Sequence, residues 1–237
     1  MSGDVIRYEP IDAVAAITLD DGKANALSPA VIAALNAALD RAEHEGRAVL
    51  LAGRPGRFSA GLDLTVMTSG RAAMHALLKS VAELVLRLYA FPRPVVLACT
   101  GHALAGGAVV LLAGDLRLGA TGAFKIGLNE VSIHLPLPIF ILELARDRLL
   151  PRWFAQATMQ AHIFDPAGAY EAGYLDELAP PEALLETAMQ RCAHLAALPA
   201  EAFRLSKDRA RRDMLARVRA TLDADIALLT VPVVQSR

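Results

Sequence analysis

The sequence predicts an α/β fold in which most strands pair in parallel. Over the first half of the chain, short apolar runs alternate with amphipathic segments of helical period, and only short connections separate them. Parallel strands need such crossovers, whereas antiparallel strands do not. Hydrophobic residues make up 54% of the 237 residues and charged residues 21%, so the chain can bury a sizeable core and is not a disordered protein.

The first three elements are two short strands and a helix. Val5–Tyr8 and Val14–Leu19 are rich in strand-forming residues, and Pro10–Asp12 between them predicts the turn of a hairpin. Ser28–Pro29 then supplies a helix N-cap followed by proline at the first helical position. Apolar residues recur at helical spacing from there until Gly46 ends the helix.

The next elements repeat this alternation. Ala48–Ala52 predicts a buried strand, and a long amphipathic helix follows Ser69–Gly70 and runs to Phe91, where Pro92 and Pro94 stop it. The rest of this half is predicted as a strand, a glycine-rich turn, a buried helix and a strand, at Val95–Ala98, Gly101–Gly107, Ala108–Ala113 and Leu116–Leu118.

After Pro136 the predicted structure is helical. Four segments have the helical period, with prolines between them: Ile139–Leu149, Arg152–Met159, Pro181–Leu198 and Glu201–Leu229. We therefore expect a main α/β region over residues 1–179 and a helical C-terminal region over residues 180–237.

The charge balance argues against a nucleic-acid or membrane partner. The 24 Lys and Arg residues nearly cancel the 25 Asp and Glu residues. The chain therefore has no overall positive charge that would attract DNA or an anionic membrane. The one basic run, Lys207–Arg212, either contacts ligand phosphates or is a solvated helix face. No aromatic residue lies within this run, which argues against a surface that stacks on nucleic-acid bases. The mean hydropathy of +0.37 is high for a soluble monomer, which suggests apolar surface buried between subunits.

Cysteine and histidine usage argues against a metal site and against a disulfide framework. Cys99 and Cys192 are the only cysteines and lie far apart, while the six histidines show no ligand spacing. The N-terminal stretch is charged rather than apolar, and the longest apolar run, Leu104–Ala113, is too short to span a bilayer. We therefore expect a cytoplasmic protein without a metal.

Two glycine-bearing turns, at residues 57–63 and 101–107, each follow a predicted buried strand. Small residues there leave backbone N–H groups unshielded, and the second turn opens a helix whose N-terminus adds partial positive charge. Two such N–H groups aimed at one point would form an oxyanion hole. Tight strand-to-helix corners have the same residue types, so the turns alone leave both interpretations open. Ser59 is an improbable nucleophile because the GxSxG elbow is absent.

Glu130 is the candidate acid/base. It lies in the segment Gly-Leu-Asn-Glu-Val-Ser-Ile, where most neighbours are apolar. A carboxyl buried among them would have a raised pKa and could carry a proton near neutral pH. An exposed or helix-capping glutamate is the other interpretation of the same segment.

Four motifs occur in one order and spacing: Asn25–Leu27, Phe58–Asp63, Gly101–Gly107 and Gly127–Glu130. In this arrangement the chain resembles the crotonase superfamily, the enoyl-CoA hydratases and isomerases. The resemblance implies a ClpP-like spiral of β-β-α units with a helical C-terminal trimerisation region, and assembly as a trimer or as a hexamer of two trimers. It also implies an acyl-CoA thioester substrate, as in fatty-acid, aromatic and amino-acid degradation. Coenzyme A would be part of the substrate, so no separate cofactor is expected.

The resemblance also implies residue roles. The backbone N–H groups of Ala60 and Gly106 would hold the thioester oxygen, and Glu130 would act on the adjacent carbons through an enolate intermediate. The positions expected to contact coenzyme A or the acyl group are Phe58, Ser59, Gly61, Leu62, Asp63, Gly107, Val109, Leu135 and Phe140.

The chain departs from the hydratase pattern at two places. Val109 stands where hydratases have one of two catalytic glutamates, and Leu137–Phe140 replaces their Gly-Ala-Gly-Gly run. This pattern is similar to the Δ3,Δ2-enoyl-CoA isomerase branch, whose reaction needs a single acid/base. His134 occupies a position where glycine is usual, and it either tunes Glu130 or is a packed or surface residue.

The sequence therefore predicts an enoyl-CoA isomerase with Glu130 as the single acid/base. Two other functions stay open: a hydratase of reduced activity that lacks the glutamate replaced by Val109, and a non-catalytic scaffold that binds acyl-CoA.

Overall fold

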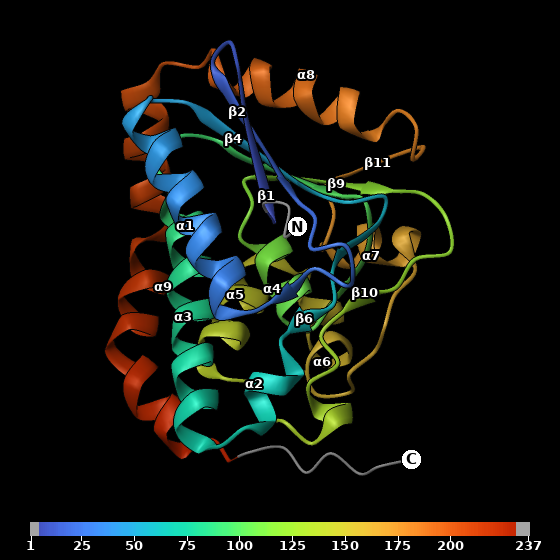
Figure 1. The fold of residues 1–237 in the computed structure, drawn as a ribbon, viewed down its shortest axis with the longest axis vertical. Helices are drawn as coiled ribbons and strands as arrows, with labels where there is room; N and C mark the ends of the chain where they lie inside the picture. The colour runs from blue at the N-terminus through green and yellow to red at the C-terminus, as the bar shows by residue number, and fades with distance from the viewer. Residues whose placement is uncertain (1–4, 231–237) are drawn as a thin grey trace.

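The computed structural model describes residues 5–230 and contains a six-stranded sheet of largely parallel strands (Figure 1). β1 and β2 are antiparallel, and each following neighbour in the sheet is parallel, as the alternation of strands and helices predicts. The strands are, in sheet order, β1 (Ile6–Ile11), β2 (Val14–Leu19), β4 (Ala48–Gly53), β7 (Val95–Cys99), β9 (Leu116–Ala120) and β11 (Glu177–Ala179).

The first hairpin is longer than predicted. β1 continues through Pro10, which pairs with Ala15 of β2, and the chain turns only at Asp12, whose φ is 46°. Proline is tolerated there because β1 is the edge strand and needs no N–H donor on its outer side. The strand therefore includes residues that local sequence rules assign to the turn.

The two glycine segments are not simple turns, which corrects the prediction for residues 57–63 and 101–107. The first segment contains two short strands and the second segment contains one, and together with two further strands these form two small parallel sheets. The first has the order β10-β8-β5 and the second is β3-β6; their bounds are β10 (Ile126–Gly127), β8 (Gly101–Leu104), β5 (Gly56–Ser59), β3 (Ala26–Leu27) and β6 (Gly61–Leu62).

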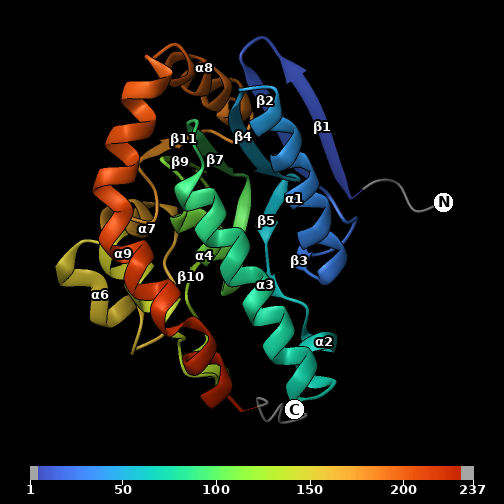
Figure 2. The same cartoon turned by 90° about the vertical axis from the view of Figure 1, so that its left-hand side faces the viewer.

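Three helices cover one face of the molecule, with α3 (Arg71–Ala90) between α1 (Pro29–His44) and α9 (Ala200–Leu228) (Figures 1 and 2). The predicted N-cap of α1 is confirmed, because the Ser28 hydroxyl accepts a hydrogen bond from the Val31 N–H at 3.2 Å. The helices bury their apolar faces in the main core together with one face of the large sheet.

The opposite face of the sheet is covered by α8 (Leu184–Ala196), which crosses β4, β7, β2 and β9. Its small and apolar side chains, including Ala188 and Cys192, pack against Val96 and Leu118 in a second, smaller core. The predicted C-terminal helices are thus present as α8 and α9, and both pack on the α/β part of the same chain.

The remaining helices are short and lie around the small sheets. They are α2 (Leu64–Thr68), α4 (Gly106–Leu112), α5 (Ile139–Arg148), α6 (Pro151–Ala157) and α7 (Pro166–Ala172), with a 3-10 turn at Val131–Ile133. The sequence patterns did not predict the helices α2 and α7 or the strands β3, β10 and β11. For α7 a signal was present, since Asp165 caps the helix by accepting from the Gly168 N–H at 2.7 Å and Pro166 occupies its first position.

Within residues 5–230, none of the helices has both the length and the hydrophobicity needed to cross a lipid bilayer. The same part of the chain contains no group of three or more His, Cys, Asp or Glu residues arranged to ligate a metal ion.

Candidate active site

The two glycine segments meet at one point of the fold. A Cβ atom at Gly61 would lie 2.9 Å from the Ala105 Cβ, and one at Gly107 would lie 2.3 Å from the Ser59 carbonyl oxygen. Real side chains do not approach this closely, so glycine is required at both positions. Residues that lie far apart in the sequence therefore form a single backbone junction.

The Ala60 N–H is not the free donor that the sequence analysis expected. It donates to the Ala24 carbonyl at 3.0 Å and is already satisfied. In the adjoining strand β6, the Asp63 N–H donates to Leu27 of β3, and successive N–H groups of a strand point to opposite edges. The Leu62 N–H therefore points away from β3 and is the better candidate on this segment.

The Gly106 N–H is the second candidate donor. Gly106 is the first residue of α4, where N–H groups have no carbonyl within the helix to bond. The preceding residue, Ala105, has a φ of 48°, a conformation that alanine rarely adopts, and its N–H donates to the Gly127 carbonyl at 3.0 Å. The backbone at the start of α4 is thus held by neighbouring segments.

Ser59 and Asn25 hold the first glycine segment in place. The Ser59 hydroxyl donates to the Asn25 carbonyl at 2.7 Å and accepts from the Gly61 N–H. The Asn25 side-chain amide, fully buried, donates to the carbonyls of Leu19 and Phe58. The sequence motif that contains Asn25 did not predict this positioning role. Asn25 has a left-handed φ of 54°, a conformation that asparagine tolerates better than most residues.

Three further predicted contact residues have structural partners in the fold. The Phe58 ring is buried in the main core, and the Asp63 carboxylate caps α2 by accepting from the Thr65 N–H at 2.9 Å. Leu62 is half-buried beside the junction.

Glu130 is brought to the junction by the small sheet. Gly127 of β10 pairs with Leu104 of β8, immediately before the start of α4. Glu130 then begins the 3-10 turn, and its carbonyl accepts from the N–H groups of Ile133 and Leu135, both at 3.0 Å. The backbone of this segment is therefore fixed by its own hydrogen bonds.

The Glu130 side chain is 3% exposed, and its Oε2 atom has no hydrogen-bond partner within residues 5–230. Burial raises the pKa of Glu130 to about 7, and its own backbone N–H opposes this shift. The carboxyl group can therefore take up and release a proton near neutral pH, as a general acid/base requires.

The segments that flank Glu130 in the chain and in the small sheet carry buried apolar residues. Val109 of α4, Leu135 and Phe140 of α5 are buried, and α4 contacts α5. α4 has the sequence Gly-Gly-Ala-Val-Val-Leu-Leu and so carries no second carboxylate. His134 is exposed and has a left-handed φ of 64°, the region that favours glycine.

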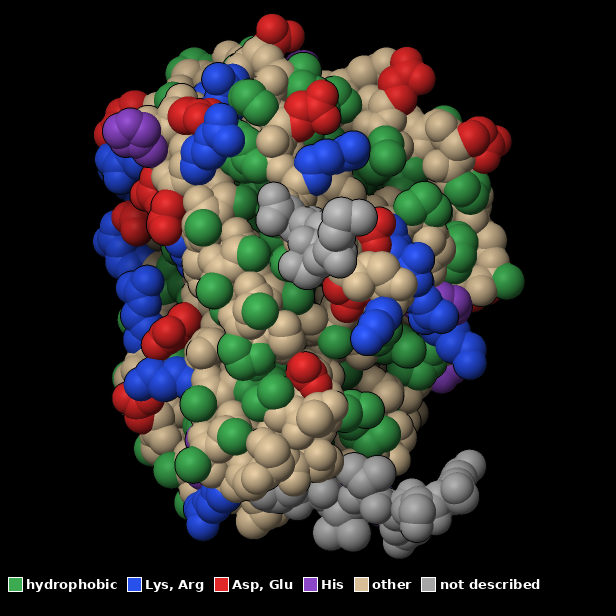
Figure 3. Space-filling model, viewed as in Figure 1, with side chains coloured by type: hydrophobic (Ala, Val, Ile, Leu, Met, Phe, Trp, Pro, Cys, Tyr) green, Lys and Arg blue, Asp and Glu red, His purple; other side chains and the backbone are tan. Residues whose placement is uncertain are grey.

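The basic run Lys207–Arg212 is divided between core and surface. Lys207 and Arg211 are each 8% exposed and form ion pairs with Asp115 at 2.7 and 2.9 Å, so they are available neither to ligand phosphates nor to solvent. The other residues of the run are exposed, and Arg212 pairs with Asp208. Along the left-hand edge in Figure 3, Lys and Arg side chains alternate with Asp and Glu, so no single-sign surface marks this region.

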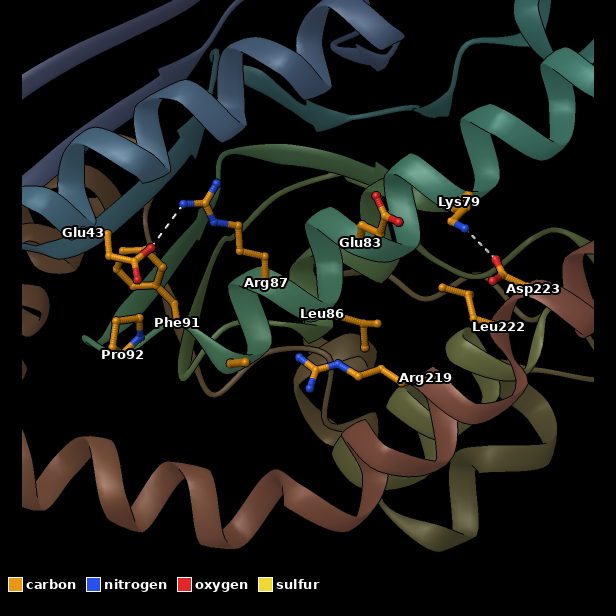
Figure 4. A pocket seen from close by; sticks show the side chains of 11 residues that line it. Glu43, Lys79, Glu83, Leu86, Arg87, Phe91, Pro92, Arg219, Leu222 and Asp223 are labelled. Carbon is orange, nitrogen blue, oxygen red and sulfur yellow. Dashed lines mark hydrogen bonds and ion pairs between the residues drawn. The ribbon is translucent and has the colours of Figure 1, made fainter.

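A surface groove of about 460 Å³ lies elsewhere, between α3 and α9. Four of its charged side chains form two pairs, Lys79 with Asp223 at 2.7 Å and Arg87 with Glu43 at 3.2 Å (Figure 4). None of the predicted site residues lines it, so this groove is separate from the candidate active site.

Comparisons with known proteins agree on one family. The sequence model described as enoyl-CoA hydratase/isomerase matches residues 9–236. The chain is 33% identical to the human mitochondrial enoyl-CoA delta isomerase 1 over 219 residues, which are 90% of this chain and 72% of that protein.

Solved structures give the same result. An enoyl-CoA hydratase/isomerase family protein from Pseudomonas syringae superposes with a TM-score of 0.94 at 40% identity, covering 96% of this chain and 99% of that chain. An enoyl-CoA hydratase from Mycobacterium marinum superposes with a TM-score of 0.91 at 37% identity, covering 95% of this chain and all (100%) of that chain. Both isomerases and hydratases therefore occur among the relatives, and the chain is a crotonase-fold member of the enoyl-CoA hydratase/isomerase family.

Proposed function

We propose that this protein is an enoyl-CoA isomerase, which converts 3-enoyl-CoA thioesters into the conjugated 2-enoyl-CoA thioesters. The observation that carries the proposal is the single buried carboxyl group at the glycine junction. Glu130 is buried there without an ion-pair partner within residues 5–230, and the family resemblance places Val109 where hydratases have a second glutamate. Isomerisation needs one acid/base, whereas water addition is best served by two.

In this mechanism the thioester oxygen accepts hydrogen bonds from the Leu62 and Gly106 N–H groups. Each such donor stabilises the enolate by roughly 3 kcal/mol in a site that excludes water. The Glu130 carboxylate removes a proton from C2, and the electron pair delocalises over the thioester and the C3–C4 double bond. The protonated Glu130 then returns the proton to C4, which moves the double bond to C2–C3.

The substrate would be bound along the glycine junction. Coenzyme A would follow the Phe58–Asp63 segment as part of the substrate, and Gly61 and Gly107 leave the backbone accessible. The buried apolar side chains of Leu135 and Phe140 would form the wall for the acyl group. Because this wall is apolar, water would be kept away from the enolate.

The hydratase function is the second candidate, and the Mycobacterium marinum relative named a hydratase favours it. In that case Glu130 alone would activate the water, at a reduced rate. A non-catalytic acyl-CoA-binding scaffold is the third.

An absorbance assay separates the three functions. With a 3-enoyl-CoA, an isomerase produces rising absorbance from the conjugated thioester. With a 2-enoyl-CoA in water, a hydratase produces falling absorbance. If neither signal changes while the thioester still binds by calorimetry, the scaffold is favoured and the isomerase proposal is wrong.

Glu130→Gln tests the assigned acid/base. The amide cannot accept the C2 proton, so we expect kcat to fall by about 10³-fold or more while thioester binding is preserved. Exposed Glu83→Gln on α3 is the control and should keep full activity. Wild-type activity in Glu130→Gln would remove this residue from the mechanism.

We also propose that the protein assembles as a trimer or as a dimer of trimers. The high mean hydropathy and the exposed apolar side chains of Leu64, Leu150 and Met159 support buried surface between subunits. Analytical ultracentrifugation should give three or six chains per particle, and a monomer at micromolar concentration would contradict this.

A further inference from the structure

A second buried titratable group, Tyr174, lies beside the segment that carries Glu130. Tyr174 follows α7 and is fully buried. Its ring packs against Phe164 with the centroids 5.7 Å apart, and Phe164 exchanges both backbone hydrogen bonds with Ile126 of β10 at 2.9 Å. The phenol is therefore tied to the strand that leads directly to Glu130.

Unsatisfied polar atoms are concentrated in this region. Six buried side-chain nitrogen or oxygen atoms within residues 5–230 have no hydrogen-bond partner, and four of them belong to Asn129, Glu130, Trp153 and Tyr174. Trp153 also packs edge-on against Phe164, at 5.7 Å between centroids. Buried polar atoms are normally paired, so such a concentration is expected at a functional site rather than in an ordinary core.

Tyr174 and Glu130 are complementary as a donor and an acceptor. A phenol donates one O–H, and an ionised carboxylate only accepts. Burial and the nearby Glu130 charge both raise the pKa of Tyr174, while the backbone N–H of Leu128 opposes them. The Tyr174 hydroxyl therefore keeps its proton at all physiological pH values and stays available as a donor.

Other elements around Glu130 offer no charged partner. Glu130 forms no ion pair in the part of the chain that the structure describes. The helix α4 contains only Gly, Ala, Val and Leu, and the first turn of α5 begins Ile-Phe-Ile. The two acids of α5 have other partners, Glu143 in an ion pair with Arg217 and Asp147 as acceptor from the Tyr89 hydroxyl, and His134 is exposed.

We propose that Tyr174 is a positioning residue whose hydroxyl donates a hydrogen bond to the Glu130 carboxylate when that group carries its charge. The terminal torsion of a glutamate side chain is broad, so the carboxylate can turn toward the phenol at little cost. One carboxylate oxygen is then held by Tyr174, and the other is directed at the substrate carbon. This inference rests on Glu130 being the acid/base of the proposed function.

Tyr174→Phe removes the hydroxyl and keeps the ring that packs on Phe164. A hydrogen bond to the charged form lowers the pKa of an acid, so its loss should raise the pKa of Glu130 by about one unit. Tyr170→Phe is the matched control, since Tyr170 lies on the neighbouring helix α7 and is 51% exposed. It should leave the pKa of Glu130 unchanged.

The pKa of Glu130 is measured without substrate, by infrared difference titration of its protonated carboxyl band, which Glu130→Gln identifies. Because no turnover is needed, a protein inactive on 3-enoyl-CoA still tests the Tyr174–Glu130 pair. If the protein is active, the acidic limb of kcat/KM should move with the infrared pKa. An unchanged pKa in folded Tyr174→Phe overturns the proposal.

A second measurement covers the case in which Tyr174→Phe does not fold. Wild-type protein grown with 3-fluorotyrosine keeps every hydroxyl but makes each a stronger donor. The other described tyrosines are engaged elsewhere or exposed, since Tyr8 bonds Glu45 and Tyr89 bonds Asp147. The labelled protein should show a lower Glu130 pKa than the unlabelled protein, and equal values would refute the pairing.

Discussion

Glu130 is held by the backbone of its own 3-10 turn, and no charged side chain within residues 5–230 compensates its burial. Structural carboxylates of this chain have the opposite environment. Glu45, for example, accepts from Arg41, Arg47 and Tyr8, and the first of these bonds contributes most to lowering its pKa to about 2. This contrast supports the proposed acid/base role of Glu130, because Glu45 instead forms hydrogen bonds that stabilise the surface.

The pH dependence of turnover follows from the raised pKa. In the proposed mechanism the Glu130 carboxylate must be ionised to remove the C2 proton, and burial raises its pKa to about 7. We therefore expect kcat/KM to fall tenfold per pH unit below about pH 7 and to level off above it. A profile that stays flat down to pH 5 would contradict the assignment.

Burial of Glu130 also makes folding stability depend on pH. Activity is expected to rise with pH, whereas folding stability is expected to fall. The folded protein keeps a proton on Glu130 that the unfolded chain releases above pH 4.5, so folding stability is lost as the pH rises toward 7. Glu130→Gln removes this titration. At pH 8 the free energy of unfolding of Glu130→Gln, measured with urea, should exceed that of the wild type by about 1–3 kcal/mol. The difference should be smaller at pH 5. If Glu130→Gln and the wild type are equally stable at both pH 5 and pH 8, the Glu130 carboxyl group is solvated rather than buried.

At this scale the sequence could predict a buried carboxyl group at Glu130, but not which N–H of the first glycine segment is free of a backbone partner. Which N–H is free depends on how β6 pairs with β3, across more than thirty residues of chain. Ala60 and Leu62 lie two positions apart, and only the register shows that the Ala60 N–H is already bonded to Ala24.

At the scale of elements, the contact between the two glycine segments determines whether the site can form. Gly107→Ala would place a methyl group 2.3 Å from the Ser59 carbonyl oxygen, on backbone that cannot yield. We expect a loss of about 3 kcal/mol in stability, measured by urea unfolding. Gly106→Ala meets the side-chain ends of Leu27 and Leu62 at 3.3 Å and the Gly61 Cα at an ordinary contact distance of 3.5 Å, and it should cost clearly less. Equal losses in both variants would show that the junction is not tightly packed.

Long elements were predicted well, whereas short ones were not. α1 and α3 agree with their periodic patterns to within a few residues, because a run of apolar positions at helical spacing is a local signal. β3, β6 and β10 are two residues long and exist only through pairing with distant segments. No local pattern of two residues can predict such a strand.

At the scale of the whole molecule, α9 is attached to the core by a buried cluster of charges. The Asp115 carboxylate accepts from Lys207 and Arg211 and also from the Val95 N–H at 2.7 Å, while the Arg211 guanidinium lies 4.0 Å from the Tyr89 ring centroid. The basic run was predicted from its charge alone, and the acid that pairs with it lies about ninety residues earlier in the chain.

Asp115→Ala should strongly destabilise the protein. It leaves two cations buried without their counter-charge, which typically costs about 3–5 kcal/mol. Asp208→Ala is the control, because Asp208 forms an exposed pair with Arg212 and should change stability by less than about 1 kcal/mol. If urea midpoints of the two variants coincide, α9 is not anchored by this cluster.

The last turns of α9 close back on the region of the candidate site. The Asp225 carboxylate accepts from the Ile139 N–H at 2.6 Å, at the start of α5, and the Leu229 carbonyl bonds His75 of α3. These two hydrogen bonds fix the C-terminal end of α9 to the start of α5 and to α3. A change at Asp225 would therefore alter the placement of Phe140, a residue of the proposed acyl wall, from a helix that is not itself part of the candidate site.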